Sequence, residues 1–154
     1  MKPVARRLEL DVSYAARRPW APSSRQLAQW ATAALFPERR WVVLSVRVVG
    51  LARSRSLNAH YRHKDKPTNV LSFDGAGRVP DGRYFLGELV ICAPVVAREA
   101  LTQRKTLQAH WAHMTVHGVL HLQGFDHEAE PDAVKMAARE VQILDRLGFS
   151  DPYR

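Results

Sequence analysis

The eleven residues at 117–127, HGVLHLQGFDH, constrain the fold of this chain more than any other feature of its sequence. His117 and His121 are four residues apart. On a helix, that spacing puts two side chains about 40° apart around the axis and about 6 Å apart along it, on one face. Gly124 can take the left-handed conformation that ends a helix and turns the chain back. We therefore expect a helix and the following turn to bring His127 beside the other two histidines.

This arrangement predicts a metal site. Three imidazoles with no cysteine nearby are typical of a catalytic zinc site, which keeps a fourth position for water. We predict one Zn²⁺ ion held by His117, His121 and His127, with water completing its coordination. The alternative is three surface or core histidines without a ligand role, and the glycine at the turn favours the metal site. For His110 and His113, further upstream, we expect packing, hydrogen bonding or substrate contact rather than ligation.

The residue after the first histidine bears on the reaction. The spacing is that of the metzincin peptidases, which place a glutamate there as general base. This chain has Gly118, which offers no group to accept a proton and so argues against peptidase activity. A metal that acidifies its water and polarises an oxyanion also suits phosphodiester cleavage, provided that a cation helps to hold the phosphate.

Length and composition indicate one globular domain over residues 1–154, with 46% apolar and 25% charged residues. Apolar stretches fall far short of the roughly 20 residues that a membrane helix needs. The N-terminus alternates charged and apolar residues, unlike a signal peptide, so we expect a cytoplasmic protein without membrane contact. The single cysteine, Cys92, has apolar neighbours and is expected to be a buried thiol.

The net charge of +8 and the isoelectric point near 10.2 would attract a polyanion such as RNA. An arginine-rich but evenly solvated surface accounts for the same numbers, so charge alone does not choose between these two interpretations.

The hydrophobic pattern alternates between strand and helix periods. Strands are expected at 8–13, 41–49, 70–73 and 84–92, and helices at about 24–37, 51–61, 96–123 and 131–147. Residues 74–82 read as a loop, and the inner face of the last helix is predicted to contain Val134, Ala138, Val141 and Leu144. We predict a single α/β (α+β) domain in which helices pack on a mixed sheet.

Three segments resemble the YbeY family of bacterial endoribonucleases. They are LNAHYRHKDKPTNVLSF at 57–73, LGELVICAPVV at 86–96 and HWAHMTVHGVLHLQGFDH at 110–127. The resemblance implies zinc-dependent, single-strand-specific cleavage in ribosomal RNA maturation, including the 3′ end of the small-subunit RNA, and a role in ribosome quality control. It also implies ribosomal RNA and the ribosome or ribosomal proteins as partners.

The resemblance assigns the zinc to His117, His121 and His127, and it singles out Arg62 as the catalytic arginine among 23 basic residues. A guanidinium can grip two phosphate oxygens at once and stabilise the charge that builds as the bond breaks. Either water or an internal hydroxyl could attack. Two other hypotheses are a ribosome-assembly factor with a structural zinc, and a metal hydrolase of another ester or amide.

Overall fold

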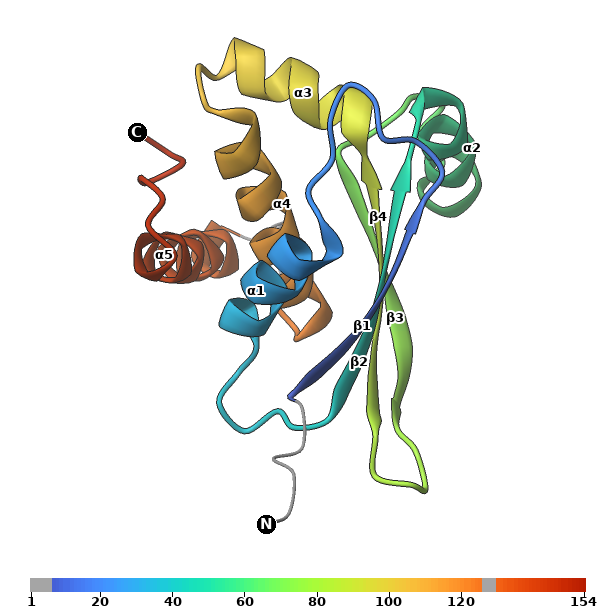
Figure 1. The fold of residues 1–154 in the computed structure, drawn as a ribbon, viewed down its shortest axis with the longest axis vertical. Helices are drawn as coiled ribbons and strands as arrows, with labels where there is room; N and C mark the ends of the chain where they lie inside the picture. Colours follow the sequence, from blue (N-terminus) through green and yellow to red (C-terminus); the bar gives the residue numbers. More distant parts are fainter. Residues whose placement is uncertain (1–6, 126–129) are drawn as a thin grey trace.

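A mixed four-stranded sheet forms the middle layer of the fold in the computed structural model, which describes residues 7–125 and 130–154 (Figure 1). Its strands are β1 (Leu8–Tyr14), β2 (Val42–Val49), β3 (Val70–Arg78) and β4 (Tyr84–Cys92), in the spatial order β1-β2-β4-β3. Strands β1, β2 and β4 run parallel, whereas β3 runs antiparallel to β4. The expected mixed sheet is confirmed for the described residues.

Five helices in the described part of the chain cover the sheet. They are α1 (Ser24–Ala34), α2 (Leu51–Arg62), α3 (Ala93–Thr102), α4 (Leu107–Leu122) and α5 (Glu130–Arg146). Figure 1 shows α1, α4 and α5 on one side of the sheet and α2 on the other. This is the α/β arrangement that the sequence pattern predicts. No helix among the described residues is long and apolar enough to cross a membrane.

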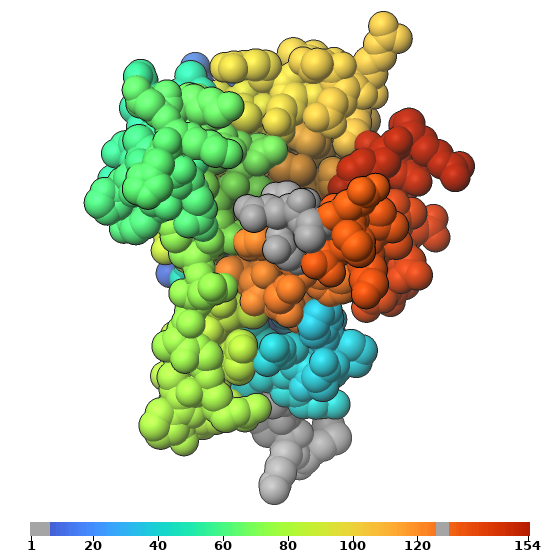
Figure 2. Space-filling view, turned by 180° about the vertical axis from the view of Figure 1, so that it is seen from behind, coloured from blue at the N-terminus to red at the C-terminus, as the bar shows by residue number. Residues whose placement is uncertain are grey.

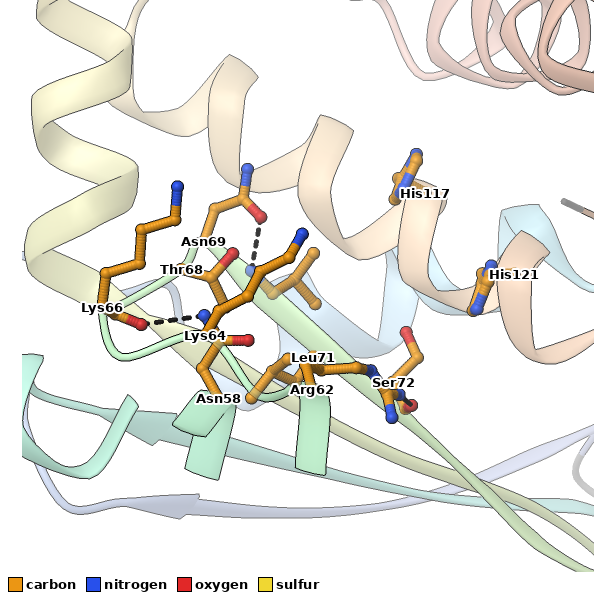
Figure 3. Close-up of a pocket in the computed structure, with 11 residues that line it drawn as sticks. Asn58, Arg62, Lys64, Lys66, Thr68, Asn69, Leu71, Ser72, His117 and His121 are labelled. Carbon is orange, nitrogen blue, oxygen red and sulfur yellow. Dashed lines mark hydrogen bonds between the residues drawn. The ribbon is translucent and has the colours of Figure 1, made fainter. Parts of the chain in front are cut away.

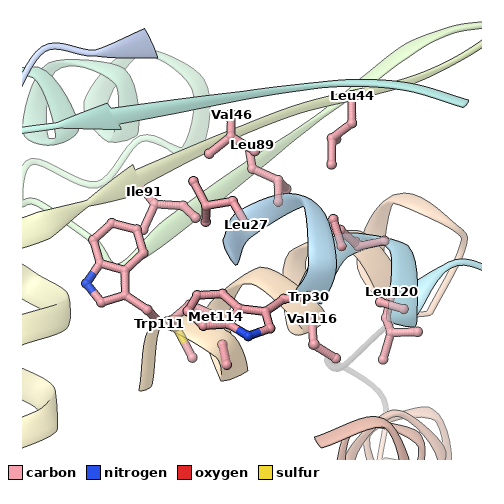
Figure 4. Close-up of a cluster of buried hydrophobic side chains, with 14 of the residues drawn as sticks. Leu27, Trp30, Leu44, Val46, Leu89, Ile91, Trp111, Met114, Val116 and Leu120 are labelled. Atoms are coloured by element: carbon pink, nitrogen blue, oxygen red, sulfur yellow. The ribbon is translucent and has the colours of Figure 1, made fainter. Parts of the chain in front are cut away.

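The main hydrophobic core lies between the sheet and the layer of α1 and α4 (Figure 4). Alternate residues of β2 point into it, and Leu44 and Val46 are fully buried there. Helix α4 contributes Trp111 and Leu120, both also fully buried. A second, smaller core under α2 includes Cys92, which is the buried thiol that the sequence predicts. The site-bearing helix α4 is therefore held by packing along most of its length.

The single long helix predicted for residues 96–123 is wrong, because the chain forms two helices, α3 and α4. Thr106 caps the second one, its side chain accepting a hydrogen bond from the Ala109 N–H at 3.0 Å. Arg104 has a positive φ of 55°, which breaks the helical path. Apolar residues continue at helical spacing on both sides of this break, so periodicity did not reveal it.

Strand β3 is longer than the sequence pattern indicates. The predicted strand ends at residue 73, yet pairing with β4 continues to Arg78 through a register shift between Asp74 and Gly77. A Cβ at Gly75 would lie 2.4 Å from the Phe85 carbonyl oxygen, so only glycine permits this close pairing. The glycines in the predicted loop at 74–82 are therefore part of a β-hairpin with a bulge.

The inner face of α5 also differs from the prediction. Val134 is 63% exposed and Ala138 is exposed too, whereas the buried residues are Met136, Glu140, Ile143 and Leu144; of the predicted residues, Leu144 is confirmed as buried. A search for apolar residues misplaces this face because its centre is a carboxylate, Glu140, that is 1% exposed.

Candidate functional site

A cavity of about 480 Å³ lies between α4 and the segment that joins α2 to β3. In Figure 2, the green residues of α2 and β3 and the orange residues of α4 and α5 form the two sides of this face of the molecule. Figure 3 shows that the side chains of the α2–β3 segment lie across the cavity from two histidines of α4. The described residues that line it are Asn58, Arg62, Lys64, Lys66, Thr68, Asn69, Val70, Leu71, Ser72, His117 and His121.

The charge of this lining is one-sided. Three cations, Arg62, Lys64 and Lys66, contribute to it, and none of the described lining residues is acidic. A concave surface lined by one sign of charge concentrates ions of the opposite sign. The cavity therefore suits an anionic ligand.

Two buried polar residues of α2 hold the loop that contains these lysines. Asn58 donates from Nδ2 to the Lys66 carbonyl at 2.8 Å. Ser54 donates from its hydroxyl to the Thr68 carbonyl at 3.0 Å and accepts from the Thr68 N–H at 3.0 Å. Each is only 2% exposed, so these bonds are shielded from water. The resemblance segment at 57–73 thus contains Asn58 and the loop that it holds, whereas Ser54 lies three residues before the segment.

Arg62, at the end of α2, is exposed and oriented by its neighbours. Its Nη2 donates to the Ser72 carbonyl at 2.9 Å, and its guanidinium lies 5.5 Å from the centre of the Phe73 ring. The Tyr61 ring packs edge-on against the same Phe73 ring, with 5.0 Å between the two ring centres. Together, the backbone bond and the ring bias an otherwise mobile side chain toward one orientation at the cavity.

His117 and His121 both line the cavity from α4, as their spacing predicts. Between them, Gly118 faces the sheet: a Cβ there would lie 2.7 Å from Cδ2 of Leu89. Gly118 is therefore required for the close approach of α4 to β4. A glutamate at this position, as in the metzincins, would not fit.

Gly124 ends the histidine helix with a φ of +105°, as expected from the sequence. The third predicted ligand, His127, lies outside the described residues. Within residues 7–125 and 130–154, no three histidine, cysteine, aspartate or glutamate side chains form a group that could hold a metal ion. The described part of the chain therefore brings two of the three predicted ligands, and Arg62, to one cavity.

Behind His117 lies the buried carboxylate of Glu140. His117 Nδ1 is 3.4 Å from each of its oxygens, His113 Nε2 is 2.8 Å from Oε2, and the Tyr153 hydroxyl donates to Oε1 at 2.8 Å. Burial acts to raise the pKa of Glu140, but hydrogen bonds from His113 and His117 outweigh it and lower that pKa to about 2. Burial lowers the pKa of His113. Glu140 is therefore ionised at neutral pH and His113 is neutral.

His110 forms a second pair of the same kind on α4. Its Nε2 lies 2.9 Å from Oε1 of Glu99, and Asn69 donates to the same carboxylate at 3.1 Å. His110 and His113 therefore both hydrogen-bond to buried or half-buried carboxylates, which is one of the roles that the sequence predicts for them. Sequence reasoning missed Glu140 and Tyr153, although a charged residue on the buried face of an amphipathic helix could have marked Glu140.

Comparison with known proteins places the chain in a family. Residues 19–148 match the family model described as "Endoribonuclease YbeY". The chain is also 51% identical, over 96% of its length and 94% of the relative, to the Endoribonuclease YbeY of Stenotrophomonas maltophilia (strain R551-3). The chain belongs to the YbeY family, as its motifs indicate, and so to a family of RNA-cleaving hydrolases.

A solved structure supports the fold. The chain is similar to the solution structure of TM1509 from Thermotoga maritima, with a TM-score of 0.57 and 22% identity. The match covers 95% of this chain and 99% of that one. At this level of identity the likeness bears on the fold alone.

Proposed function

We propose that this chain is a zinc-dependent endoribonuclease that cleaves single-stranded RNA in the cavity between α4 and the α2–β3 segment. The observation that supports this proposal most directly is the composition of that cavity, in which three cations face two helix-borne histidines without an acidic side chain among the described lining residues. A phosphodiester group would find both an anion-binding surface and metal-type ligands there. Membership of the YbeY family supports the same reaction.

His117, His121 and His127 are the proposed ligands of one Zn²⁺ ion. The donor chemistry of the described pair fits: both histidines line the cavity from one helix, and His117 turns its Nδ1 toward the Glu140 carboxylate. The support for His127 is its spacing in the sequence. A zinc ion bound there would supply a Lewis acid that stabilises negative charge on a phosphate oxygen.

Arg62 is proposed to bind the phosphate that is cleaved. One of its terminal nitrogens donates to Ser72, and this bond directs the guanidinium at the cavity. The remaining N–H groups can pair with two phosphate oxygens as charge builds on them. Lys64 and Lys66 then hold neighbouring phosphates of the same strand as point charges.

Family membership supports a more specific assignment. We infer that the substrate is ribosomal RNA in the cytoplasm, including the 3′ end of the small-subunit RNA, and that the protein acts in ribosome maturation and quality control with the ribosome or ribosomal proteins as partners. The positive net charge of +8 favours association with such a polyanion.

The test is an RNA digestion with purified protein. A labelled single strand with the small-subunit 3′ end sequence should be cut, a scrambled strand cut more slowly, and the corresponding duplex left intact. A chelator should stop cleavage and added zinc restore it. His117→Ala should lose bound zinc, by elemental analysis, and cleavage together. Arg62→Ala should keep RNA binding but lose about 10²–10³-fold in kcat, the usual effect of removing one transition-state donor.

Full cleavage by a zinc-free His117→Ala protein, or by wild-type protein in excess chelator, would contradict the metal-dependent mechanism. Chelator-resistant RNA binding without any cleavage would instead support the alternative of an assembly factor with a structural zinc.

A further inference from the structure

Glu140 occupies an unusual position for a glutamate, since it is 1% exposed on the inner face of α5. Three hydrogen-bonding groups from two other parts of the chain surround its carboxylate: the rings of His113 and His117 on α4, and the hydroxyl of Tyr153. Burying a charge is costly unless it is well hydrogen-bonded. The carboxylate of Glu140 is therefore held in place by partners on two other parts of the chain.

The hydrogens of this cluster can be assigned. The Tyr153 hydroxyl donates to this carboxylate, and the carboxylate oxygens are acceptors for an imidazole N–H that faces them. His113 then has its hydrogen on Nε2, and its Nδ1 is buried without a hydrogen-bonding partner among the described residues. Donation from His117 to the same carboxylate, whose oxygens are each 3.4 Å from Nδ1, requires the His117 hydrogen on Nδ1. In that tautomer, the lone pair that can bind a cation is on Nε2 of His117.

We propose that Glu140, anchored by Tyr153 and His113, is a positioning residue that fixes the ring and tautomer of His117 for metal binding. A ligating histidine that donates its other N–H to a carboxylate is held in one orientation and becomes a stronger ligand. The proposal rests on the proposed function in one respect, namely that His117 is a ligand. It adds the C-terminal segment, through Tyr153, to the residues that determine metal affinity.

The chain offers a matched control in Glu99. This carboxylate also pairs with a histidine of α4, His110, with a contact of 2.9 Å against the 2.8 Å of the Glu140–His113 pair. Neither Glu99 nor His110 lines the cavity that contains His117 and His121. Loss of Glu99 thus removes a comparable pair from the same helix without touching the proposed ligand.

The experiment measures zinc affinity by competition with a chelator in wild-type protein, Glu140→Gln, Tyr153→Phe and Glu99→Gln. Glu140→Gln keeps the volume of the side chain but replaces one acceptor oxygen with a donor. It should weaken zinc binding by about 10–100-fold. Tyr153→Phe removes one hydroxyl and keeps the ring, so it should weaken binding less. The zinc affinity of Glu99→Gln should stay within about twofold of the wild-type value, even if the melting temperature of this variant is lower.

A second measurement separates positioning from simple stabilisation. Long-range ¹H–¹⁵N spectra of the metal-free protein distinguish histidine tautomers, and wild-type His117 should have its hydrogen on Nδ1. Glu140→Gln and Tyr153→Phe should shift His117 toward a mixture, whereas Glu99→Gln should not. If Glu140→Gln does not fold, Tyr153→Phe alone supplies both readouts, since it leaves the buried carboxylate in place.

Equal zinc affinity in wild type and the folded Glu140 and Tyr153 variants, with an unchanged His117 tautomer, would overturn the positioning role. An equal loss in Glu99→Gln would overturn it too, because the effect would then be general destabilisation of α4. Failure of the wild-type protein to bind any zinc would count against the metal centre of the proposed function, whereas the tautomer measurement would still decide the role of Glu140.

Discussion

Gly118 lies where α4 packs closely against the sheet, and its lack of a side chain serves this packing. A Cβ at this position would lie 2.7 Å and 3.0 Å from the two terminal carbons of Leu89, which is fully buried. An added methyl group would require the Leu89 side chain to repack or one of the two elements to move. Since α4 also contains His117 and His121, such a movement would reach the proposed metal site.

We therefore predict that Gly118→Ala destabilises the protein by about 1–3 kcal/mol, the usual cost of overpacking a core. Chemical denaturation of wild type and variant gives this value. The control is the same change in a Leu89→Ala background, where the clashing atoms are absent and the extra cost of Gly118→Ala should largely disappear. Equal costs in both backgrounds would show that packing against Leu89 is not the cause.

For single residues, the sequence predicts the proposed site only where the residues concerned belong to the same helix or turn. The spacing of His117 and His121 predicts their shared face because both belong to one helix. Glu140 contacts His117 across 23 residues, and Tyr153 contacts Glu140 across 13. Those contacts depend on how α5 and the C-terminal segment dock onto α4, which no periodicity encodes. Arg62 came from the family resemblance, since nothing local distinguishes it from other arginines.

Among the elements, α2 and its following loop act as one unit. The helix buries Ser54 and Asn58, and these residues bond the backbone of the loop that includes Lys64 and Lys66. A loop held by buried side chains is ordered before a ligand arrives, so less conformational entropy is lost on binding.

Asn58→Ala should thus weaken RNA binding in addition to lowering stability by about 1–3 kcal/mol, the cost of breaking a buried hydrogen bond. Fluorescence anisotropy with a labelled single strand measures the first effect and denaturation the second. Ser23→Ala is the matched control: it removes the N-cap of α1, which should cost about 1 kcal/mol. Because Ser23 does not line the cavity, that variant should bind RNA normally, and an equal loss in both variants would refute preorganisation of the loop.

The element boundaries show where pattern analysis succeeds and fails. Strand β2 and helix α2 begin and end within one residue of the prediction, since the β-branched run of the strand ends at Gly50, which also precedes the helix. The division between α3 and α4 was missed because it depends on the cap at Thr106 and the backbone of Arg104 rather than on hydrophobicity. The buried face of α5 was misplaced because Glu140 is at its centre.

For the whole molecule, the fold class follows from the alternation of strands and helices, but the strand order β1-β2-β4-β3 does not. That order brings the start of β3 beside α4 and so creates the cavity. The sequence likewise predicts an excess of positive charge without its location. Of the 23 basic residues in the sequence, three of those that the structure describes line the cavity.

This distribution predicts a measurable salt dependence. Binding of single-stranded RNA should weaken as salt rises, with log Kd changing by about 0.7 per log unit of salt for each phosphate contact. Replacing Lys64 and Lys66 with glutamine should therefore reduce the slope by about 1.4. The control replaces Arg25 and Arg146, which are exposed and do not line the cavity. It changes the net charge equally and should leave the slope nearly unchanged; a similar reduction in both would indicate diffuse attraction by total charge.

Two carboxylates from different helices form hydrogen bonds with α4 at successive turns. Glu99 of α3 contacts His110, and Glu140 of α5 contacts His113. Each residue step along a helix turns it by about 100°. A shift of α4 by one residue would break both hydrogen bonds and rotate the proposed ligands away from the cavity. These two contacts therefore fix the rotation of α4 about its own axis. The direction in which His117 and His121 point is set by the neighbouring helices α3 and α5 as well as by α4 itself.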